Sequence, residues 1–391
     1  MQVHLIVGLS MCLAAAPAHL RAEELSALAR TIRSVAAEGR GNPEAASAWN
    51  ELADQKAEAL PEILAGMDGC GPLAVNWMRA AAEVVAQRSR ERGEKFPTEA
   101  IKAFLADRRH DPRSRRLAFE LLQADNPQAA ELLIPSFADD PSTELRREAV
   151  TRLLSAATES EAKKDPSAPE RYRSALSAAR DPDQIKTAHE ALKKLGQTVD
   201  LARHFGFICN WKLVGPFDNS AKKGFAVAYP PETQIKLDGS YDGKQGAVKW
   251  IDHVTTDENG RVDVNKAVGK HMGAVVYAVH FFESDRPQPV DVRLGSSNAT
   301  KVWLNGKLIH SADIYHANVS IDQYTGRGQL EAGRNVILVK VCQNEQTEEW
   351  AQEWRFQLRV CDSTGTAVLS KDRPAAAAVP PTNLDLAGSK P

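Results

Sequence analysis

Apolar residues in the first half of this chain recur every three or four positions, which is the spacing of amphipathic helices. Three successive groups show it: Leu117, Phe119, Leu121 and Leu122; Ala130, Leu132, Leu133 and Ile134; and Leu145, Ala149, Val150, Leu153 and Leu154. This spacing places the apolar side chains on one helix face, and that face must be buried against a neighbour. Groups separated by one short helix and a turn predict antiparallel helices in series, an α-hairpin solenoid, over residues 23–200.

Asp or Asn followed directly by proline punctuates the same region. The dipeptide occurs at positions 42–43, 111–112, 126–127, 140–141, 165–166 and 181–182. An Asp or Asn side chain accepts hydrogen bonds from the free N–H groups of a first helical turn. Proline at the next position lacks an N–H that would stay unpaired there, and its φ is already helical. Each dipeptide therefore predicts the start of a helix.

The pattern changes after Gly196 to short runs rich in Val, Ile, Phe and Trp. Eight runs predict strands, at residues 205–214, 248–252, 274–283, 290–294, 301–304, 307–310, 336–342 and 355–361. Turn residues separate them, and we expect the turn Gly215-Pro216-Phe217-Asp218-Asn219 to end the first strand. Many strands with few helices between them predict an antiparallel β-sandwich over residues 203–363. The fold class is therefore multidomain, α then β.

One turn is specified more sharply than the rest. Asn305-Gly306 stands between two of the predicted strands. Both residue types tolerate positive φ, as both central positions of a type I′ turn require. The dipeptide therefore predicts a tight two-residue hairpin.

Part of the helical half resembles a known repeat family. The segment Asp140-Pro141-Ser142-Thr143-Glu144-Leu145-Arg146-Arg147-Glu148-Ala149 is similar to the second helix of a HEAT-type repeat. That family favours Asp-Pro, then an apolar residue with Arg, then Ala. The resemblance covers residues 80–170. It implies a solenoid that acts as a spacer or binds a protein partner, and no active site.

The second half is similar to galactose-binding-like jelly-roll modules, over residues 205–362. The resemblance rests on four motifs in order: Trp-x-Leu-Val-Gly-Pro-Phe from Trp211, Val-Trp-Leu-Asn-Gly-Lys from Val302, Leu-x-Ala-Gly-x-Asn-x-Ile-Leu-Val-Lys-Val from Leu330, and Trp-x-Phe-x-Leu-x-Val from Trp354. Such modules occur as the non-catalytic sugar-binding domains of β-galactosidase-type glycosidases and in exported bacterial multidomain proteins. The resemblance implies a jelly-roll sandwich and a carbohydrate ligand.

The two ends of the chain carry features of their own. Residues 1–22 resemble a signal peptide: Leu5–Ala16 is apolar, and Ala16-Pro17-Ala18 offers the small residues that signal peptidase accepts. A first buried helix is the alternative. Export predicts a secreted or periplasmic protein, and no apolar segment is long enough for a transmembrane span. Residues 364–391 are rich in Pro and Ala and predict a disordered tail.

Charge and cysteine content narrow the partners. The formal net charge is -2 with 26% charged residues, so a nucleic-acid partner, which needs a basic face, is not expected. Removal of a signal peptide leaves four cysteines: Cys70, Cys209, Cys342 and Cys361. Two alternatives stay open for them, either four free thiols or one disulfide bridge. No His or Cys spacing is diagnostic of a metal site, so we expect no metal and no cofactor.

Catalytic chemistry has little support in the sequence. Glu348, Glu349 and Glu353 lie close together, but glycoside hydrolysis needs two carboxylates fixed across a cleft, and a loop between strands is a poor place for them. A conceivable triad has no nucleophile elbow around its serine; its members would be Ser296, His280 and Asp291. We therefore expect a protein that is not an enzyme.

Binding is better supported, by a cluster of polar and aromatic residues after the predicted hairpin. Aromatic faces stack on sugar rings, while Asp, Asn and His hydrogen-bond hydroxyl groups. The candidate ligand-binding residues are His310, Asp313, Tyr315, His316, Asn318 and, from a neighbouring loop, Trp350. An ordinary polar loop is the alternative.

Two function classes stay open. The first is an exported binding protein whose sandwich recognises a polysaccharide or surface glycan and whose helices serve as a spacer or partner-binding surface. The second is a protein–protein scaffold in which a protein partner binds the helical repeats and the sandwich is structural. An exposed aromatic strip at one end of the sandwich would favour the first. A concave, uncharged and apolar face on the helices would favour the second.

Overall fold

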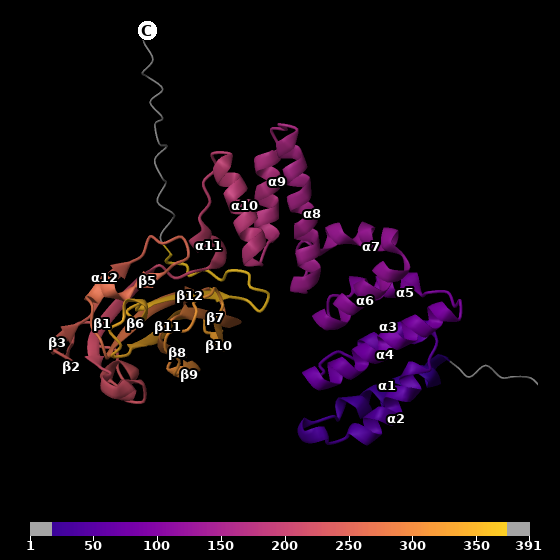
Figure 1. Cartoon of the computed structure of the whole chain (residues 1–391), viewed down its shortest axis with the longest axis horizontal. Coiled ribbons are helices and arrows are strands. Elements are labelled where there is room, and N and C mark those ends of the chain that lie inside the picture. Colours follow the sequence, from indigo (N-terminus) through magenta and orange to yellow (C-terminus); the bar gives the residue numbers. More distant parts are fainter. Residues whose placement is uncertain (1–17, 374–391) are drawn as a thin grey trace, which may run out of the picture. The chain divides into compact units, whose positions relative to one another are not determined.

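The computed structural model describes residues 18–373, with side chains from residue 22 onward. Helices occupy the first part of the chain and antiparallel sheets the second (Figure 1), which confirms the predicted fold class, α then β. The chain divides into two compact units, Met1–Ala179 and Arg180–Pro391. Most of the predicted signal peptide (residues 1–17) and most of the predicted tail (residues 374–391) lie outside the described residues.

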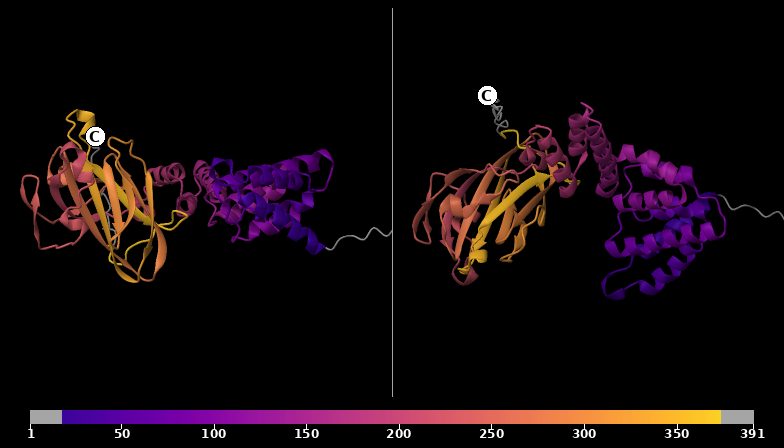
Figure 2. Two further views of the ribbon diagram at one scale, coloured as in Figure 1. Left: turned by 90° about the horizontal axis from the view of Figure 1, so that it is seen from below. Right: turned by 45° about the horizontal axis from the view of Figure 1, so that its top comes forward.

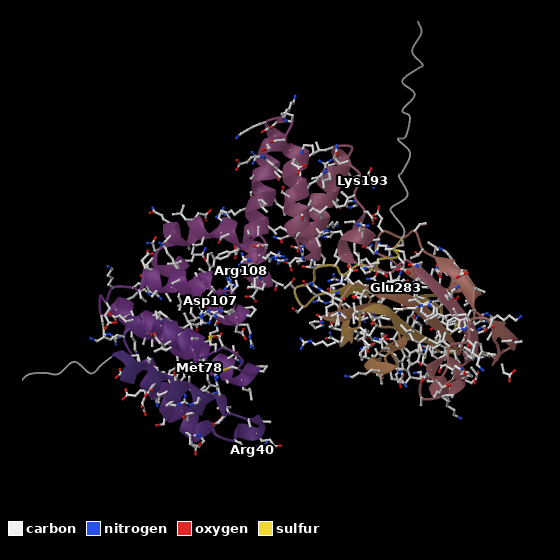
Figure 3. The ribbon with its side chains drawn as sticks, turned by 180° about the vertical axis from the view of Figure 1, so that it is seen from behind. Arg40, Met78, Asp107, Arg108, Lys193 and Glu283 are labelled. Carbon is white, nitrogen blue, oxygen red and sulfur yellow. The ribbon has the colours of Figure 1, made fainter. Side chains whose placement is uncertain are left out.

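The helical unit is a series of helices that pack on their chain neighbours in successive layers (Figure 2). A continuous apolar core runs between the layers, from Leu25 to Ala149, and the fully buried Met78 lies inside it (Figure 3). The helices are α1 (Ala18–Arg33), α2 (Asn42–Ala53), α3 (Leu60–Ala65), α4 (Pro72–Glu91), α5 (Thr98–Ala106), α6 (Pro112–Asp125), α7 (Pro127–Leu133), α8 (Thr143–Ala162) and α9 (Ala168–Ala178).

The Asp/Asn-Pro dipeptides start helices as predicted in most places. Asp111 caps α6 by accepting from Arg113 N (2.9 Å), and Asn126 caps α7 by accepting from Ala129 N (3.0 Å). The predictions for Asp140 and Asp165 are wrong, because Ser142 is the N-cap of α8 and Ser167 is the N-cap of α9.

Asp140 instead forms a buried ion pair with Arg115 of α6. The Arg115 guanidinium donates to both carboxylate oxygens, at 2.6 and 2.7 Å, and both side chains are 1% exposed. Arg115 also donates to Leu105 O at the end of α5 (2.7 Å). This pair therefore ties α5, α6 and the loop before α8 together inside the core.

The second unit begins with two helices, α10 (Pro182–Lys194) and α11 (Leu201–Phe205), and continues as a two-layered sandwich. One sheet has the order β4-β1-β6-β11-β8-β9, the other β10-β7-β12-β5, and β2-β3 form a separate hairpin. Every pairing among these strands is antiparallel. The strands are β1 (Asn210–Asp218), β2 (Ser240–Gly243), β3 (Gly246–Lys249), β4 (Ile251–Val254), β5 (Val262–Asp263), β6 (Ala274–Ser284), β7 (Gln288–Ser296), β8 (Ala299–Leu304), β9 (Lys307–Ala312), β10 (Tyr324–Leu330), β11 (Gly333–Gln343) and β12 (Arg355–Cys361); the short helix α12 spans Val264–Val268.

The central strands β6 and β11 of the six-stranded sheet are buried on both faces. In β6, Val276 and Ala278 point into the core between the sheets, whereas Val275 and Tyr277 belong to a second core on the outer face. This two-sided burial explains why β6 is an uninterrupted apolar run rather than an alternating one. Something must therefore cover the outer face, and the loop after β1 does so.

Several details differ from the sequence-based prediction, and the short strands β2 and β5 are among the elements it did not include. The first strand is not ended by Gly215-Pro216, because β1 starts at Asn210 and runs through that dipeptide to Asp218 with a shift in register. The single strand predicted at 248–252 is divided between β3 and β4. Strand β10 was not predicted, because Gly326 and Gly328 interrupt its apolar pattern. A side chain at Gly326 would meet Ile309 O at 2.8 Å, so close packing on β9 requires the glycine.

The predicted hairpin is confirmed. Asn305 and Gly306 have φ values of 51° and 78°, and they join β8 to β9 with Leu304 paired to Lys307. The Asn305 side chain also accepts from Val336 N (2.8 Å) and donates to Asn335 Oδ1 (2.8 Å), which ties the turn to β11.

Replacing Gly306 by valine tests this turn. No atom lies within 4 Å of the position where the new Cβ would be, so the expected cost comes from the positive φ alone, at about 1–2 kcal/mol. Hydrogen exchange in the full chain should quicken around β8 and β9 and stay unchanged in α4 and α6. An unchanged exchange rate at the hairpin would contradict the tight turn.

The start of the predicted tail is ordered. Val368 N donates to Val360 O (3.0 Å), and Lys371 N donates to Glu283 O (3.1 Å) at the end of β6; Figure 3 labels Glu283. The assignment of residues 364–373 to a disordered tail is therefore corrected. This segment runs over the side chain of His280, which bonds to Asn210 O through Nδ1 (2.9 Å).

Burial lowers the pKa of His280, although its bond to Asn210 O opposes the shift. A folded pKa below the unfolded value of about 6.5 means that the unfolded state takes up the proton first as pH falls. The stability contribution is therefore complete above pH of about 6.5 and is lost below it. We expect denaturant unfolding of the second unit to shift to lower midpoints between pH 7.5 and 5. His280→Gln should make the unfolding midpoint depend less on pH. If the midpoint of the variant falls as steeply between pH 7.5 and 5, groups other than His280 cause the loss of stability.

Candidate functional site

The loop after β1 forms a strap, residues 219–235, over the outer face of the six-stranded sheet. Lys340 of β11 holds it: its ammonium group donates to Val227 O (2.6 Å), Phe225 O (3.2 Å) and Glu232 Oε1 (2.8 Å). The Lys340 side chain is 0% exposed. Because a buried ammonium group must have its donors satisfied, this lysine and the strap specify each other's positions.

Aromatic rings complete the surroundings of the lysine. The ammonium nitrogen lies 5.6 Å from the Tyr229 ring centroid and 5.5 Å from that of Tyr277, while Tyr277 OH donates to Glu232. Burial lowers the pKa of Lys340, and the hydrogen bond with Glu232 opposes that shift. Burial raises the pKa of the Tyr277 hydroxyl, and its hydrogen bond to the Glu232 carboxylate raises it further. The phenol therefore keeps its proton and donates it to Glu232.

The start of the strap meets two other segments at Asn219. This side chain is fully buried, and its Nδ2 donates to Gln343 O (2.9 Å) at the end of β11 and to Tyr315 OH (3.1 Å) in the loop after β9. The amide therefore joins three segments that are far apart in sequence. Together they build one end of the sandwich.

A hollow of about 480 Å³ opens at this end. It is lined by Ala221 and Lys222 of the strap and by residues 344–348 of the loop that leads from β11 to β12. Ala221 and Lys222 have φ values of 54° and 61°, which are uncommon for residues other than glycine. The Ala221 N–H donates to Glu345 Oε2 (2.8 Å), so the two walls of the hollow are bonded to each other.

An aromatic pair stands beside the hollow. Asn344, which lines it, places Nδ2 2.8 Å from His316 Nε2, and the His316 ring meets Trp350 edge to face with centroids 5.0 Å apart. Trp350 is 64% exposed. The Tyr315 ring lies under the Lys222 ammonium at 5.0 Å, and burial raises the pKa of the Tyr315 hydroxyl. An exposed indole therefore lies against an imidazole, and that imidazole bonds to an amide at the edge of the hollow.

The structure brings together three of the six residues that the sequence suggested: Tyr315, His316 and Trp350. Asp313 is exposed close to Tyr315, and Asn318 is exposed further along the same loop. His310 lies on β9 instead, where Nε2 is 3.3 Å from Thr300 Oγ1 and the ring stacks at a tilt on Tyr324. Burial lowers the pKa of His310, which indicates a neutral packing residue.

Sequence reasoning missed the residues that build the walls. Asn344 and Glu345 come shortly after the predicted strand at 336–342, and the polar run Asn-Glu-Gln-Thr after β11 was a usable signal for them. Asn219 and Lys222 carried no such signal, because they lie more than 90 residues from Tyr315 in sequence and meet it only through the strap.

The groups considered for catalysis are apart from one another. Ser296 Oγ donates to Arg355 O (2.8 Å), while His280 bonds to Asn210 O, so the conceivable triad is not assembled. Glu353 pairs with Arg355 at 2.8 Å. Among residues 22–373, no group of three or more His, Cys, Asp and Glu side chains is placed to hold a metal ion.

The four cysteines of the described chain are free thiols, and Cys70, Cys342 and Cys361 are buried. Burial raises the pKa of the Cys342 thiol to about 12 and that of Cys361 to about 11, so both are held as unreactive thiols. In the part of the chain that the structure describes, no helix is long and apolar enough to cross a membrane.

No family model matches this chain, and no curated protein matches it either. The resemblances to HEAT repeats and to galactose-binding-like modules therefore remain predictions. Solved structures give remote matches. A β-glucosidase from Kluyveromyces marxianus in complex with glucose is 13% identical with a TM-score of 0.24, over 39% of this chain and 16% of that one. An anti-sigma factor domain-containing protein is 14% identical with a TM-score of 0.24, over 41% of this chain and 48% of that one.

A β-glucuronidase from an uncultured Clostridium species is 16% identical with a TM-score of 0.22, over 40% of this chain and 29% of that one. This chain thus covers less than half of the length of each of these three proteins. Likeness at this level is too weak to assign a function, so the functional argument rests on the site itself.

Proposed function

We propose that the second unit binds a polysaccharide or surface glycan at the Trp350 end of the sandwich, as a binding module without catalytic activity. The observation that carries the proposal is an exposed indole beside a polar hollow. Sugar rings present C–H faces that pack on aromatic rings and hydroxyl groups that take hydrogen bonds. Trp350 supplies the first kind of contact, and the exposed Gln346 and Lys222, which line the hollow, supply the second.

The build of the site suits this role. Its walls are held by Asn219 and by the Ala221–Glu345 bond, so little ordering is needed when a ligand binds. The hollow is open to solvent, which suits a chain-like ligand that extends beyond it. The galactose-binding-like resemblance of residues 205–362 suggests the same ligand class, and the predicted signal peptide would place the protein where such glycans occur.

The scaffold alternative gains no comparable support. The surface of α4, α6 and α8 carries a ladder of ion pairs rather than an uncharged apolar face. Its contacts are Arg79 Nη2–Glu120 (2.6 Å), Arg116 Nε–Glu120 (2.8 Å) and Arg116 Nη1–Glu148 (2.9 Å). We therefore propose the helices as a spacer that carries the binding unit.

A glycan array with the full chain, followed by titration of the best ligand, tests the proposal. Trp350→Ala should weaken binding by about ten- to thirtyfold, because an aromatic anchor contributes about 2 kcal/mol. Trp350→Phe keeps an aromatic face and should retain most of the affinity. Leu308→Ala, at an exposed position on β9, is the matched control and should change nothing. Binding unaffected by Trp350→Ala would move the site elsewhere, and binding to no glycan would refute the function.

A further inference from the structure

The loop between β11 and β12 is strongly acidic. Four of its residues are glutamates: Glu345, Glu348, Glu349 and Glu353. Two of these carboxylates have partners, because Glu345 accepts from Ala221 N and Glu353 pairs with Arg355. Glu348 and Glu349 are exposed, and no ion pair involves either of them among the side chains that the structure describes. They come directly before Trp350.

The strap brings two exposed lysines to this end of the sandwich, Lys222 and Lys223, against the three exposed glutamates Glu345, Glu348 and Glu349. Lys222 is the one cation that lines the hollow, against Glu345 and Glu348. The Lys222 ammonium lies over the Tyr315 ring, which gives it a favourable partner already. The nearby Lys244 is neutralised by Asp218 at 3.0 Å and donates to Met272 O. A ligand that rests on Trp350 therefore enters a field of net negative sign.

We propose that this site selects its ligand by charge: it takes a neutral glycan and rejects glycans that carry uronate or sulfate groups. This inference rests on the proposed function and names its ligand class. The unpaired carboxylates of Glu348 and Glu349 set the selectivity, since like charges brought within a few ångströms repel each other. Because both groups are exposed, dissolved salt screens the repulsion.

The most direct test compares the affinities of the protein for one oligosaccharide in a neutral and in a negatively charged form. The neutral glycan that binds best on the array is oxidised at its primary hydroxyl groups, which converts them to carboxylates on the same backbone. The full chain should bind the oxidised form at least tenfold more weakly at low salt. Added salt should narrow this difference.

Variants separate charge from shape. The double variant Glu348→Gln, Glu349→Gln should bind the oxidised oligosaccharide more tightly than the native chain does. Its affinity for the neutral oligosaccharide should be unchanged, so the ratio of the two affinities should fall. Glu353→Gln is the matched control, because Arg355 already neutralises that carboxylate, and it should leave the difference as it is.

Three results would count against the inference. If the array ligands are mainly acidic glycans that need Trp350, the selectivity is wrong while the binding function stands. If the double variant leaves the difference unchanged, the discrimination comes from shape and the inference falls. If no glycan of either kind binds, the proposed function fails, and this inference fails with it.

Discussion

Replacing Lys340 by methionine is expected to lower the free energy of unfolding of the second unit by about 3–5 kcal/mol. Methionine keeps the length of the side chain but removes the charge, which leaves the Glu232 carboxylate, 12% exposed, without its cation. Two strap carbonyls, Phe225 O and Val227 O, lose their donor as well. Denaturant unfolding of the full chain measures the loss, and hydrogen exchange should show the strap opening first.

A double variant separates the charge from the packing. Lys340→Met combined with Glu232→Gln removes both charges and should recover part of the lost stability, because no unpaired charge then stays buried. Equal stability of Lys340→Met and the native chain would show that the strap does not depend on this lysine. Lys340 would then not fix the position of the strap residues that line the hollow.

Asp140→Ala is expected to destabilise the helical unit by a similar amount, about 3–5 kcal/mol. Its partner Arg115 is 1% exposed and would keep a buried charge, with Leu105 O as its remaining hydrogen-bond acceptor in the part of the chain that the structure describes. Denaturant unfolding should show an earlier loss of the helical circular dichroism signal. Hydrogen exchange should quicken in α5, α6 and α8 but not in β6 or β11.

Asp139 provides the matched control for this variant. It pairs with Arg108 at 2.7 Å, but its side chain is 78% exposed, and exposed pairs contribute about 0–1 kcal/mol. Asp139→Ala should therefore have little effect. If Asp139→Ala and Asp140→Ala cost the same, the Arg115 pair is not the buried tie that the structure shows.

Local sequence signals predicted what depends on neighbours in the chain. Asp111 and Asn126 cap their helices because the proline that follows fits a first turn. Asn305-Gly306 forms its hairpin because both residues accept positive φ. Asp140 shows the limit of such reasoning. Its carboxylate pairs with the buried Arg115 instead of capping α8, and Ser142 caps that helix.

The candidate site was predictable only in part, for the same physical reason. Tyr315 and His316 follow a strand end, and Trp350 lies in a polar loop, so local pattern indicated them. The walls depend on long-range contacts that no local pattern carries. Lys340 interrupts an apolar run, and nothing nearby in sequence indicates that the strap buries it. Asn219 has the sequence of an ordinary turn residue, and its contact with Tyr315 is 96 residues distant in the chain.

The central claim is that a glycan rests on Trp350 at one end of the sandwich, and indole NMR tests it most directly. The chain has seven tryptophans, and each contributes one indole N–H signal. Assignment by substitution identifies the signal of Trp350. Titration of the full chain with its array ligand should shift that signal and leave those of Trp49, Trp77, Trp211 and Trp354 in place. A shift confined to another tryptophan, or no shift at a ligand concentration that saturates binding, would contradict the account.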